Sequence, residues 1–177
     1  MTQTPPPEDP DTPLEQRLVA LIPRLRRFAR VLTGGRDEAD DLVQSALERA
    51  LDRLAQWQPG TRLDSWMFRI MQNLWIDWLR GHEGRTDRYV PLEDALELPG
   101  ADGRRDGEAR VELNRVLAAI ARLPADQRAV MALVSVEAYS YREAADALDI
   151  PIGTVMSRLA RARVRLNELL GGPGDPD

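Results

Sequence analysis

The sequence predicts an all-α protein made of two small helical domains joined by a flexible linker. Apolar residues recur every three to four positions in several separate stretches, as in helices with one buried face. No stretch sustains the alternation of apolar and polar residues that is typical of strands. Between residues 84 and 107 the helical pattern stops, and glycine, proline and interspersed charges replace it. That segment is too long for an ordinary loop inside one compact domain, which favours two domains.

These boundaries divide the 177 residues into five segments. They are a proline-rich tail predicted to be disordered (1–13), a first domain (14–83), a linker (84–107), a second domain (108–170) and a short tail (171–177). Acidic charge gathers in the tails and the linker, while each predicted domain has a net charge of +1. The total charge of −5 therefore does not exclude a nucleic-acid partner.

The first domain begins with two predicted helices. Apolar residues from position 14 to position 32 form a helical stripe, which Pro23 interrupts. Because proline lacks the backbone donor and clashes with the preceding turn, we expect either a kink or two short helices there. Asp37 is the expected N-cap of the next helix, which runs to about Trp57.

A loop containing Pro59 and Gly60 precedes the third predicted helix, from about Ser65 to Arg80. Four polar residues share one face of this helix: Arg69, Gln72, Asn73 and Arg80. All four tryptophans fall within 22 residues: Trp57, Trp66, Trp75 and Trp78. Tryptophan rings stack on unpaired bases in single-strand binding proteins, yet they also fill cores. The cluster by itself does not decide between these roles.

The second domain opens with helical periodicity from position 111 to position 123, and Pro124 suits the first turn of a helix that continues to about Val136. Ser140 and Glu143 then fit a capping box, which predicts the start of another helix. That short helix is expected to stop at Asp149, a residue type that tolerates the left-handed conformation of a tight turn.

The stretch PIGTVMSRLARARVRL, from 151 to 166, holds four arginines and no acid. A helix opening at Gly153 and Thr154 places its apolar residues along one stripe, and a neighbouring polar face carries Ser157, Arg158, Arg161 and Arg165. A short helix, a tight turn and a cationic helix form the helix-turn-helix pattern of DNA-binding proteins. The alternative is a solvated arginine face on an ordinary bundle helix.

Composition excludes several kinds of site. The chain has no cysteine and a single histidine, His82, so it has no disulfide and neither a thiolate nor a histidine-built metal site. We expect no cofactor. No apolar run reaches 18 residues, and the N-terminus lacks the apolar core of a secretory signal. These features predict a cytoplasmic protein without membrane insertion.

Taken in order, four stretches resemble regions 2.2, 2.3–2.4, 4.1 and 4.2 of the extracytoplasmic-function (group IV) sigma factors of bacterial RNA polymerase. They are DEADDLVQSALERAL, LDSWMFRIMQNLWIDWLR, LPADQRAVMAL and YREAADALDIPIGTVMSRLARARVRL. The resemblance implies an alternative sigma factor that binds core polymerase and directs promoter recognition and melting, without catalysis of its own.

The resemblance also implies how the two domains divide this work. The first would bind the polymerase clamp and capture the melted −10 element, and the second would bind the flap and read the −35 duplex. Implied core-binding residues are Asp40, Asp41, Leu42 and Gln44. Implied −10-binding residues are Arg62, Arg69, Gln72, Asn73, Asp77 and Arg80. Implied −35-binding residues are Thr154, Met156, Ser157, Arg158, Arg161 and Arg165.

Three positions depart from the family's pattern. Gln72 stands where an arginine is usual, Asp149 replaces a turn glycine, and Met156 takes the place of a frequent lysine or arginine. The Met156 difference predicts weaker phosphate binding rather than lost specificity. The implied partners are the RNA polymerase core, promoter DNA and an anti-sigma factor, and we expect a monomer when the chain is free.

Two other classes of function remain open at this point. A stand-alone helix-turn-helix regulator would dimerise and bind duplex DNA tightly without polymerase. An enzyme would need a catalytic cluster, for which Asp40 and Asp41 are the available carboxylates, but these are better explained as charges near a helix start.

Overall fold

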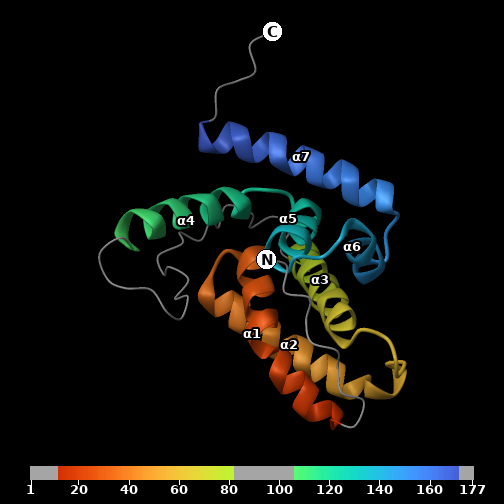
Figure 1. The fold of residues 1–177 in the computed structure, drawn as a ribbon. Helices are drawn as coiled ribbons and strands as arrows, with labels where there is room; N and C mark the ends of the chain where they lie inside the picture. Colours follow the sequence, from red (N-terminus) through yellow and green to blue (C-terminus); the bar gives the residue numbers. More distant parts are fainter. Residues whose placement is uncertain (1–11, 82–105, 172–177) are drawn as a thin grey trace.

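The computed structural model describes residues 12–81 and 106–171, and the regular elements of this part of the chain are all helices, without strands (Figure 1). The predicted tails, apart from residues 12, 13 and 171, lie outside the described residues, as does the predicted linker up to residue 105. Residues 106 and 107, assigned to the linker above, form the start of a helix instead. The all-α class is confirmed.

Helix α1 runs without a break from Leu14 to Thr33, which excludes two short helices, one of the two outcomes expected at Pro23. Pro23 removes only one intrahelical hydrogen bond, while apolar residues on both sides of it are buried against the neighbouring helices. The helix ends at Gly34, which has φ +82° and donates its N–H to the Arg30 carbonyl oxygen. Such a left-handed position after a helix is usual for glycine.

Helix α2 spans Arg36–Asp52 and is followed by a 3₁₀ turn, η1 (Leu54–Gln56), and by α3 (Leu63–Gly81). Asp37 is not the N-cap, because Gly35 occupies that position in extended conformation. Asp37 lies in the first turn of α2 instead, where a carboxylate still interacts favourably with the positive end of the helix dipole.

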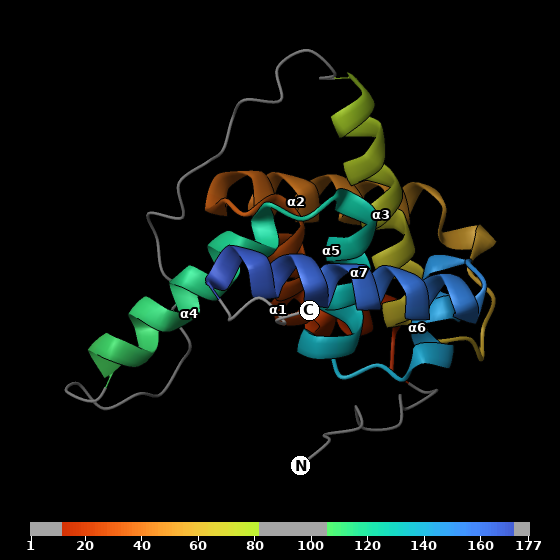
Figure 2. The same cartoon turned by 90° about the horizontal axis from the view of Figure 1, so that it is seen from above.

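The second part of the chain contains α4 (Asp106–Ala121), α5 (Ala125–Met131), α6 (Tyr141–Leu148) and α7 (Ile152–Leu170). Between α5 and α6 lies a π-helical segment, η2 (Ala132–Val136). Helix α7 packs on α4, α5 and α6, on their side away from α1 and α2 (Figures 1 and 2). This arrangement leaves one side of α7 on the outside of the molecule.

We call α1–α3 the first unit and α4–α7 the second unit. The first unit packs around two aromatic rings, Phe28 and Phe68, whose centroids are 4.6 Å apart and which are fully buried. In the second unit Val130, Leu133, Val155 and Leu159 are the large side chains that are almost completely buried. Helical periodicity identified this core only in part, because Val111, at the start of one periodic stretch, is 69% exposed and Val136, at the end of another, is 38% exposed.

The two units pack directly on each other. Helix α3 lies against α6, and α1 lies against α4, α5 and η2 (Figures 1 and 2). Tyr139, just before α6, places its ring edge-on against Phe68 of α3 at a centroid distance of 5.8 Å. The buried residues of both units accordingly form one continuous hydrophobic cluster. Sequence periodicity predicted two helical units but did not predict this contact.

Candidate nucleic-acid interface

The capping box at the start of α6 is confirmed. The Ser140 Oγ accepts a hydrogen bond from the Glu143 N–H at 3.2 Å, and Glu143 Oε2 accepts one from the Ser140 N–H at 2.8 Å. These bonds satisfy donors that the first turn of a helix otherwise leaves without partners. Hydrogen bonding to Ser140 also holds the pKa of Glu143 below its usual range.

The turn after α6 forms as predicted, with Asp149 in the left-handed conformation at φ 55° and ψ 48°. The Ile150 N–H reaches back to the Ala145 carbonyl oxygen at 3.1 Å and closes the turn. Helix α7 then begins at Ile152, directly after Pro151 and slightly before the predicted Gly153–Thr154 start. The two helices and the turn between them have the helix-turn-helix arrangement.

Helix α7 separates an apolar from a polar side. Val155, Leu159 and Ala162 are buried against the second unit, while the polar candidates differ in exposure. Met156, Ser157, Arg161 and Arg165 are exposed, and Thr154 is half-buried. The Arg158 side chain is 22% exposed and its Nε lies 3.0 Å from Asp126 Oδ2 of α5. Arg158 is therefore held by its own unit, whereas Arg161 and Arg165 face solvent.

The −10 candidates form two groups along α3. Asn73, Asp77 and Arg80 are exposed toward its C-terminal end, with Arg80 Nη1 3.9 Å from Asp77 Oδ1. Arg62 and Arg69 are half-buried at its N-terminal end, where they face the second unit. The six −10 candidates therefore do not form one continuous exposed surface.

Gln72 differs from the rest of the predicted polar face of α3, because it is only 6% exposed. Its position three residues after Arg69 and one before Asn73 gave no indication of this burial. Gln72 is therefore not available at the surface.

The tryptophan cluster contains both buried and exposed rings. Trp75 is 6% exposed, and Trp78 stacks on it with ring centroids 4.8 Å apart while remaining 46% exposed. Trp57 and Trp66 are half-buried. The core interpretation therefore holds for Trp75, whereas Trp78 keeps much of one large ring at the surface.

The candidate core-binding residues lie on α2. Asp40, Asp41 and Gln44 are exposed, but Leu42 is only 7% exposed and packs into the core of the first unit. Asp40 Oδ1 lies 3.4 Å from Arg26 Nε of α1. The exposed part of this stretch is polar and acidic.

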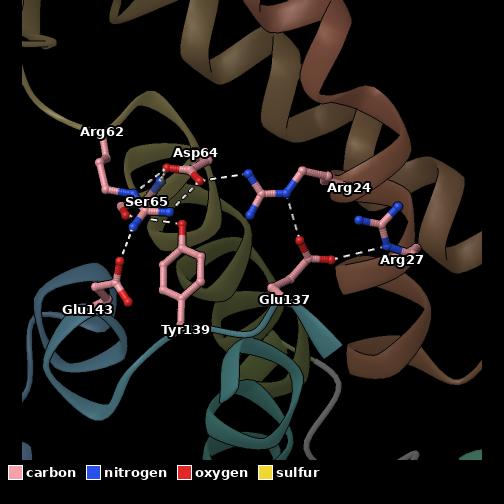
Figure 3. A network of polar contacts seen from close by, with 8 residues as sticks. All are labelled: Arg24, Arg27, Arg62, Asp64, Ser65, Glu137, Tyr139 and Glu143. Atoms are coloured by element: carbon pink, nitrogen blue, oxygen red, sulfur yellow. Dashed lines mark hydrogen bonds and ion pairs between the residues drawn. The ribbon is translucent and has the colours of Figure 1, made fainter. Parts of the chain in front are cut away.

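A polar network joins the two units beside these surfaces (Figure 3). We call it the interunit network; its members are Arg24, Arg27, Arg62, Asp64, Ser65, Glu137, Tyr139 and Glu143. Arg24 of α1 donates to Asp64 Oδ2 and to Glu137 Oε2, both at 2.7 Å. Arg62 contacts Asp64 Oδ2 at 2.9 Å and Glu143 Oε1 of α6. Carboxylates of both units are thus shared by arginines of the first.

Burial and charge in this network shift several pKa values. Burial alone would raise the pKa of Asp64, but hydrogen bonds from Arg62, Tyr139 and Arg24 outweigh it and lower that pKa to about 2. Burial and the charge of Asp64 raise the pKa of Tyr139 above its ordinary value. Asp64 is therefore an anion, and Tyr139 a neutral phenol, at neutral pH.

Arg128 of α5 makes a further contact between the units. It is 8% exposed, donates to the backbone carbonyl oxygen of Leu32 in α1, and its guanidinium carbon lies 5.6 Å from the Trp75 ring centroid. Burial lowers the pKa of Arg128 to about 10, so the side chain remains charged at neutral pH. A cation held over an aromatic face is a recognised stabilising contact.

Sequence reasoning missed Asp64, Arg128 and Glu137 as interunit residues. Each is a charged residue buried to at least nine-tenths, and burial of that kind requires partners. Glu137 stands directly before Ala138, which has φ +57°, an unusual conformation for alanine. An isolated charge in an apolar stretch such as MALVSVEAYS is the signal that was available.

No group of three metal-ligating side chains occurs within residues 12–81 and 106–171. Among the helices of those two ranges, none is both long and apolar enough to cross a membrane.

Two protein-family models match the two units separately. Residues 18–72 match the model described as the Sigma2 domain of PhyR, and residues 113–166 match the model described as Sigma-70, region 4. The second match contains the whole of α5, α6 and the turn that follows, and most of α7.

Curated relatives match across nearly the whole chain. The chain is 37% identical over 164 residues to the "ECF RNA polymerase sigma factor EcfG" of Rhodopseudomonas palustris, covering 93% of this chain and 88% of that protein. It is 36% identical over 148 residues to the "ECF RNA polymerase sigma factor SigM" of Mycobacterium tuberculosis, covering 84% and 72%.

Two solved structures have a similar fold. The sigma factor RpoE of Bartonella quintana, solved in complex with the anti-sigma factor NepR, aligns with a TM-score of 0.69 and 33% identity over 90% of this chain and 98% of that one. CnrH, solved in complex with the cytosolic domain of CnrY, aligns with a TM-score of 0.64 and 27% identity over 90% and 88%.

Proposed function

The chain belongs to the ECF sigma factors of bacterial RNA polymerase, and from this membership we propose which of its surfaces bind polymerase and promoter. As a member, it is an alternative sigma factor that directs transcription initiation. We infer a specificity subunit without a reaction of its own, which acts in the cytoplasm, where polymerase and promoter are found.

The observation that carries the assignment of surfaces is the helix-turn-helix of α6 and α7 with its solvent-facing arginines. Arg161 and Arg165 are exposed on α7, and Ser157 lies beside them. A helix of this kind enters the major groove, and its arginines bind phosphates and guanine edges. We assign −35 duplex recognition to this surface, with Thr154, Met156 and Arg158 at its margin.

We assign capture of the melted −10 strand to α3 and the residue before it. Asn73, Asp77 and Arg80 are exposed there, and the Trp78 ring offers a stacking surface beside them. Stacking on an aromatic ring and cationic contact with the backbone are how proteins hold single strands. Arg62 and Arg69 belong to the same set, as does Gln72, which is buried in the present structure.

Polymerase core is proposed to bind at α2, in contact with Asp40, Asp41 and Gln44. Leu42 would hold α2 in position by packing into the core of the first unit. The clamp would take this first-unit surface and the flap would take the second unit. An anti-sigma factor is proposed as a further partner, since the similar sigma factor RpoE of Bartonella quintana was solved in complex with the anti-sigma factor NepR. We expect the free chain to be a monomer.

Binding to core polymerase tests the proposal directly. The purified chain is mixed with core RNA polymerase, and co-migration is followed by size-exclusion chromatography. We expect a stable one-to-one complex, weakened by Asp41→Asn and unchanged by Asp52→Asn, which removes the same charge from another exposed position of α2. Equal binding by both variants would contradict the assignment of the clamp surface.

A stand-alone helix-turn-helix regulator is the competing function, and a second titration separates it. Binding of the isolated chain to duplex DNA is measured across a range of salt concentrations. An ECF sigma factor binds such DNA weakly without core polymerase, whereas a regulator binds it tightly as a dimer, with a strong dependence on salt. Tight duplex binding together with no binding to core polymerase would reject the proposed polymerase role.

A further inference from the structure

The N-terminal end of α3 is covered by the first helix of the helix-turn-helix. Arg69 donates from Nε to the carbonyl oxygen of Ala147 at 3.2 Å and from Nη2 to that of Asp146 at 2.6 Å. Its Nη1 also lies 3.8 Å from Oδ2 of Asp149. The guanidinium of Arg69 is thus placed at the C-terminal end of α6, where the helix dipole is negative.

Arg62 is held by the other end of the same helix. Its Nη1 contacts Glu143 Oε1, and its guanidinium carbon lies 4.4 Å from the centroid of the Tyr139 ring (Figure 3). Together with Arg69, it meets two carboxylates and two backbone carbonyl oxygens of α6 and its C-cap. These acceptors offer the arginines the same chemistry as phosphate oxygens, which arginine binds through the same planar fork of donors.

We propose that α6 is an intramolecular substitute for the backbone of the −10 strand. In the free chain it occupies Arg62 and Arg69, and a DNA strand must displace it before these arginines bind phosphate. This inference rests on the proposed assignment of both arginines to the −10 strand. It adds that the closed arrangement of the two units is a self-inhibited state of the sigma factor.

The contacts with α6 are suited to reversal. Side-chain exposure is 37% for Arg62 and 43% for Glu143, and it is 42% for Arg69 and 81% for Asp149. Ion pairs with this much solvent are weak and are screened by salt. A polyanion that presents many phosphates therefore competes effectively with α6.

The two proposed DNA surfaces differ in the closed state. Arg161 and Arg165 are exposed residues of α7, and α7 lies on the side of the second unit away from α1 and α2 (Figure 1). Duplex DNA reaches them without any separation of the units, whereas a single strand reaches Arg62 and Arg69 only after α6 moves. The occupation of Arg62 and Arg69 by α6 therefore blocks binding of the −10 strand and leaves binding of the −35 duplex unaffected.

Two conservative changes remove the negative side chains of α6 while keeping its structure. In Glu143→Gln the amide still accepts the N-cap hydrogen bond, because glutamine also forms capping boxes. In Asp149→Asn the new residue also tolerates the left-handed conformation. The matched control is Glu112→Gln with Glu168→Gln, which removes the same two charges from exposed positions of the second unit.

The first measurement is the affinity of each full-length protein for a short fluorescein-labelled oligothymidylate, a probe of backbone binding without base preference. Each exposed ion pair contributes up to about fivefold, so we expect the Glu143→Gln/Asp149→Asn protein to bind several-fold more tightly than the control double variant. Circular dichroism confirms that helix content is unchanged. Equal affinities of these two double variants would overturn the proposal.

The second measurement follows the separation of the units. The chain lacks cysteine, so cysteines introduced at the exposed Gln56 and Asn167 carry spin labels at defined positions of the two units. We expect one narrow distribution of distances in the wild-type chain, because the two units pack in a fixed arrangement, and a changed, broader distribution after the oligothymidylate is added. A broad distribution in the free wild-type chain, or no change when the oligothymidylate is bound, would overturn the proposal.

Neither measurement requires polymerase, so the two proposals fail separately. A chain that closes and opens as expected but does not bind core polymerase would contradict the proposed function. A chain that binds core polymerase but is already open would contradict self-inhibition alone.

Discussion

Arg24 and Glu137 are 113 residues apart in the chain, yet Arg24 Nε donates to Glu137 Oε2 at 2.7 Å. The Glu137 side chain is only 1% exposed and also accepts from Arg27 Nε at 3.3 Å. One carboxylate of the second unit is thus shared by two arginines of α1. We expect the packing of the two units to depend on this residue.

Replacing this carboxylate is expected to destabilise the protein. Glu137→Ala leaves the largely buried Arg24 with Asp64 as its remaining partner, and removing one member of a buried ion pair costs about 3 kcal/mol. Urea unfolding followed by circular dichroism measures the loss. Glu112→Ala, at an exposed position of α4, is expected to cost less than about 0.5 kcal/mol. Similar losses for both variants would show that the network contributes little.

The lowered pKa of Asp64 predicts that the folded protein loses stability in acid. Its pKa is about 2 in the folded chain and near 3.8 when unperturbed, so the folded state keeps this carboxylate ionised over a range where the unfolded state binds a proton. The resulting stabilisation, about 2 kcal/mol, is present above pH 4 and disappears as the pH falls toward 2. Urea unfolding at several pH values should give a flatter profile for Asp64→Asn across this interval. Parallel profiles would contradict the assignment.

Removing the N-cap of α6 is expected to lower the stability of the protein moderately. Ser140→Ala removes the acceptor of the Glu143 N–H and should cost about 1 kcal/mol. In a domain pair of this size, that corresponds to a decrease in Tm of about 2–4 °C. Ser45→Ala, at an exposed position within α2, serves as the control and should leave Tm unchanged or slightly higher.

Two glycines with positive φ allow the cost of backbone strain to be distinguished from the cost of a clash between the units. Gly34 has φ +82°, and a Cβ there would lie 3.0 Å from the Ala121 Cβ of α4, whereas Gly60 has φ +87° with open space around it. Both alanine variants should lose about 1 kcal/mol through strain, and Gly34→Ala should lose more. If unfolding in urea shows equal losses, then α1 and α4 do not approach this closely in solution.

The arginines of α7 predict a position-dependent effect on DNA binding. Arg161→Gln should weaken binding of the polymerase holoenzyme to duplex DNA containing its −35 element, and should reduce the dependence on salt by one phosphate contact, a slope change of about 0.9. Arg163→Gln removes an exposed arginine from the opposite flank of α7 and is the control. Equal salt dependence in both variants would contradict the proposed orientation of α7.

Local signals accounted for the features that were predicted correctly. The capping box involves Ser140 and Glu143, three residues apart, and the turn depends on the conformational tolerance of Asp149 alone. Pro23 shows the limit of such signals. Its cost to α1 is local and visible in the sequence, but burial of residues on both sides against other helices outweighs it.

Features that depend on distant pairs were not predictable from local patterns. Leu42 and Gln72 were placed at binding surfaces, yet both are buried by neighbouring elements. Arg62 and Arg69 have the residue type and spacing of DNA-binding side chains, and nothing in the surrounding sequence indicates that α6 would occupy them. Only the packing of the two units reveals that competition.

Glu143 belongs to two structures at once. Its Oε2 closes the capping box of α6, and its Oε1 binds Arg62 of the first unit. Folding of the helix and docking of the units therefore share one side chain, and most substitutions at this position would damage both. Glutamine is the exception, because it keeps the cap and weakens the docking. A single substitution at position 143 would therefore change how easily the two units separate without unfolding α6. Natural variation at this position could in this way adjust the fraction of molecules that are open.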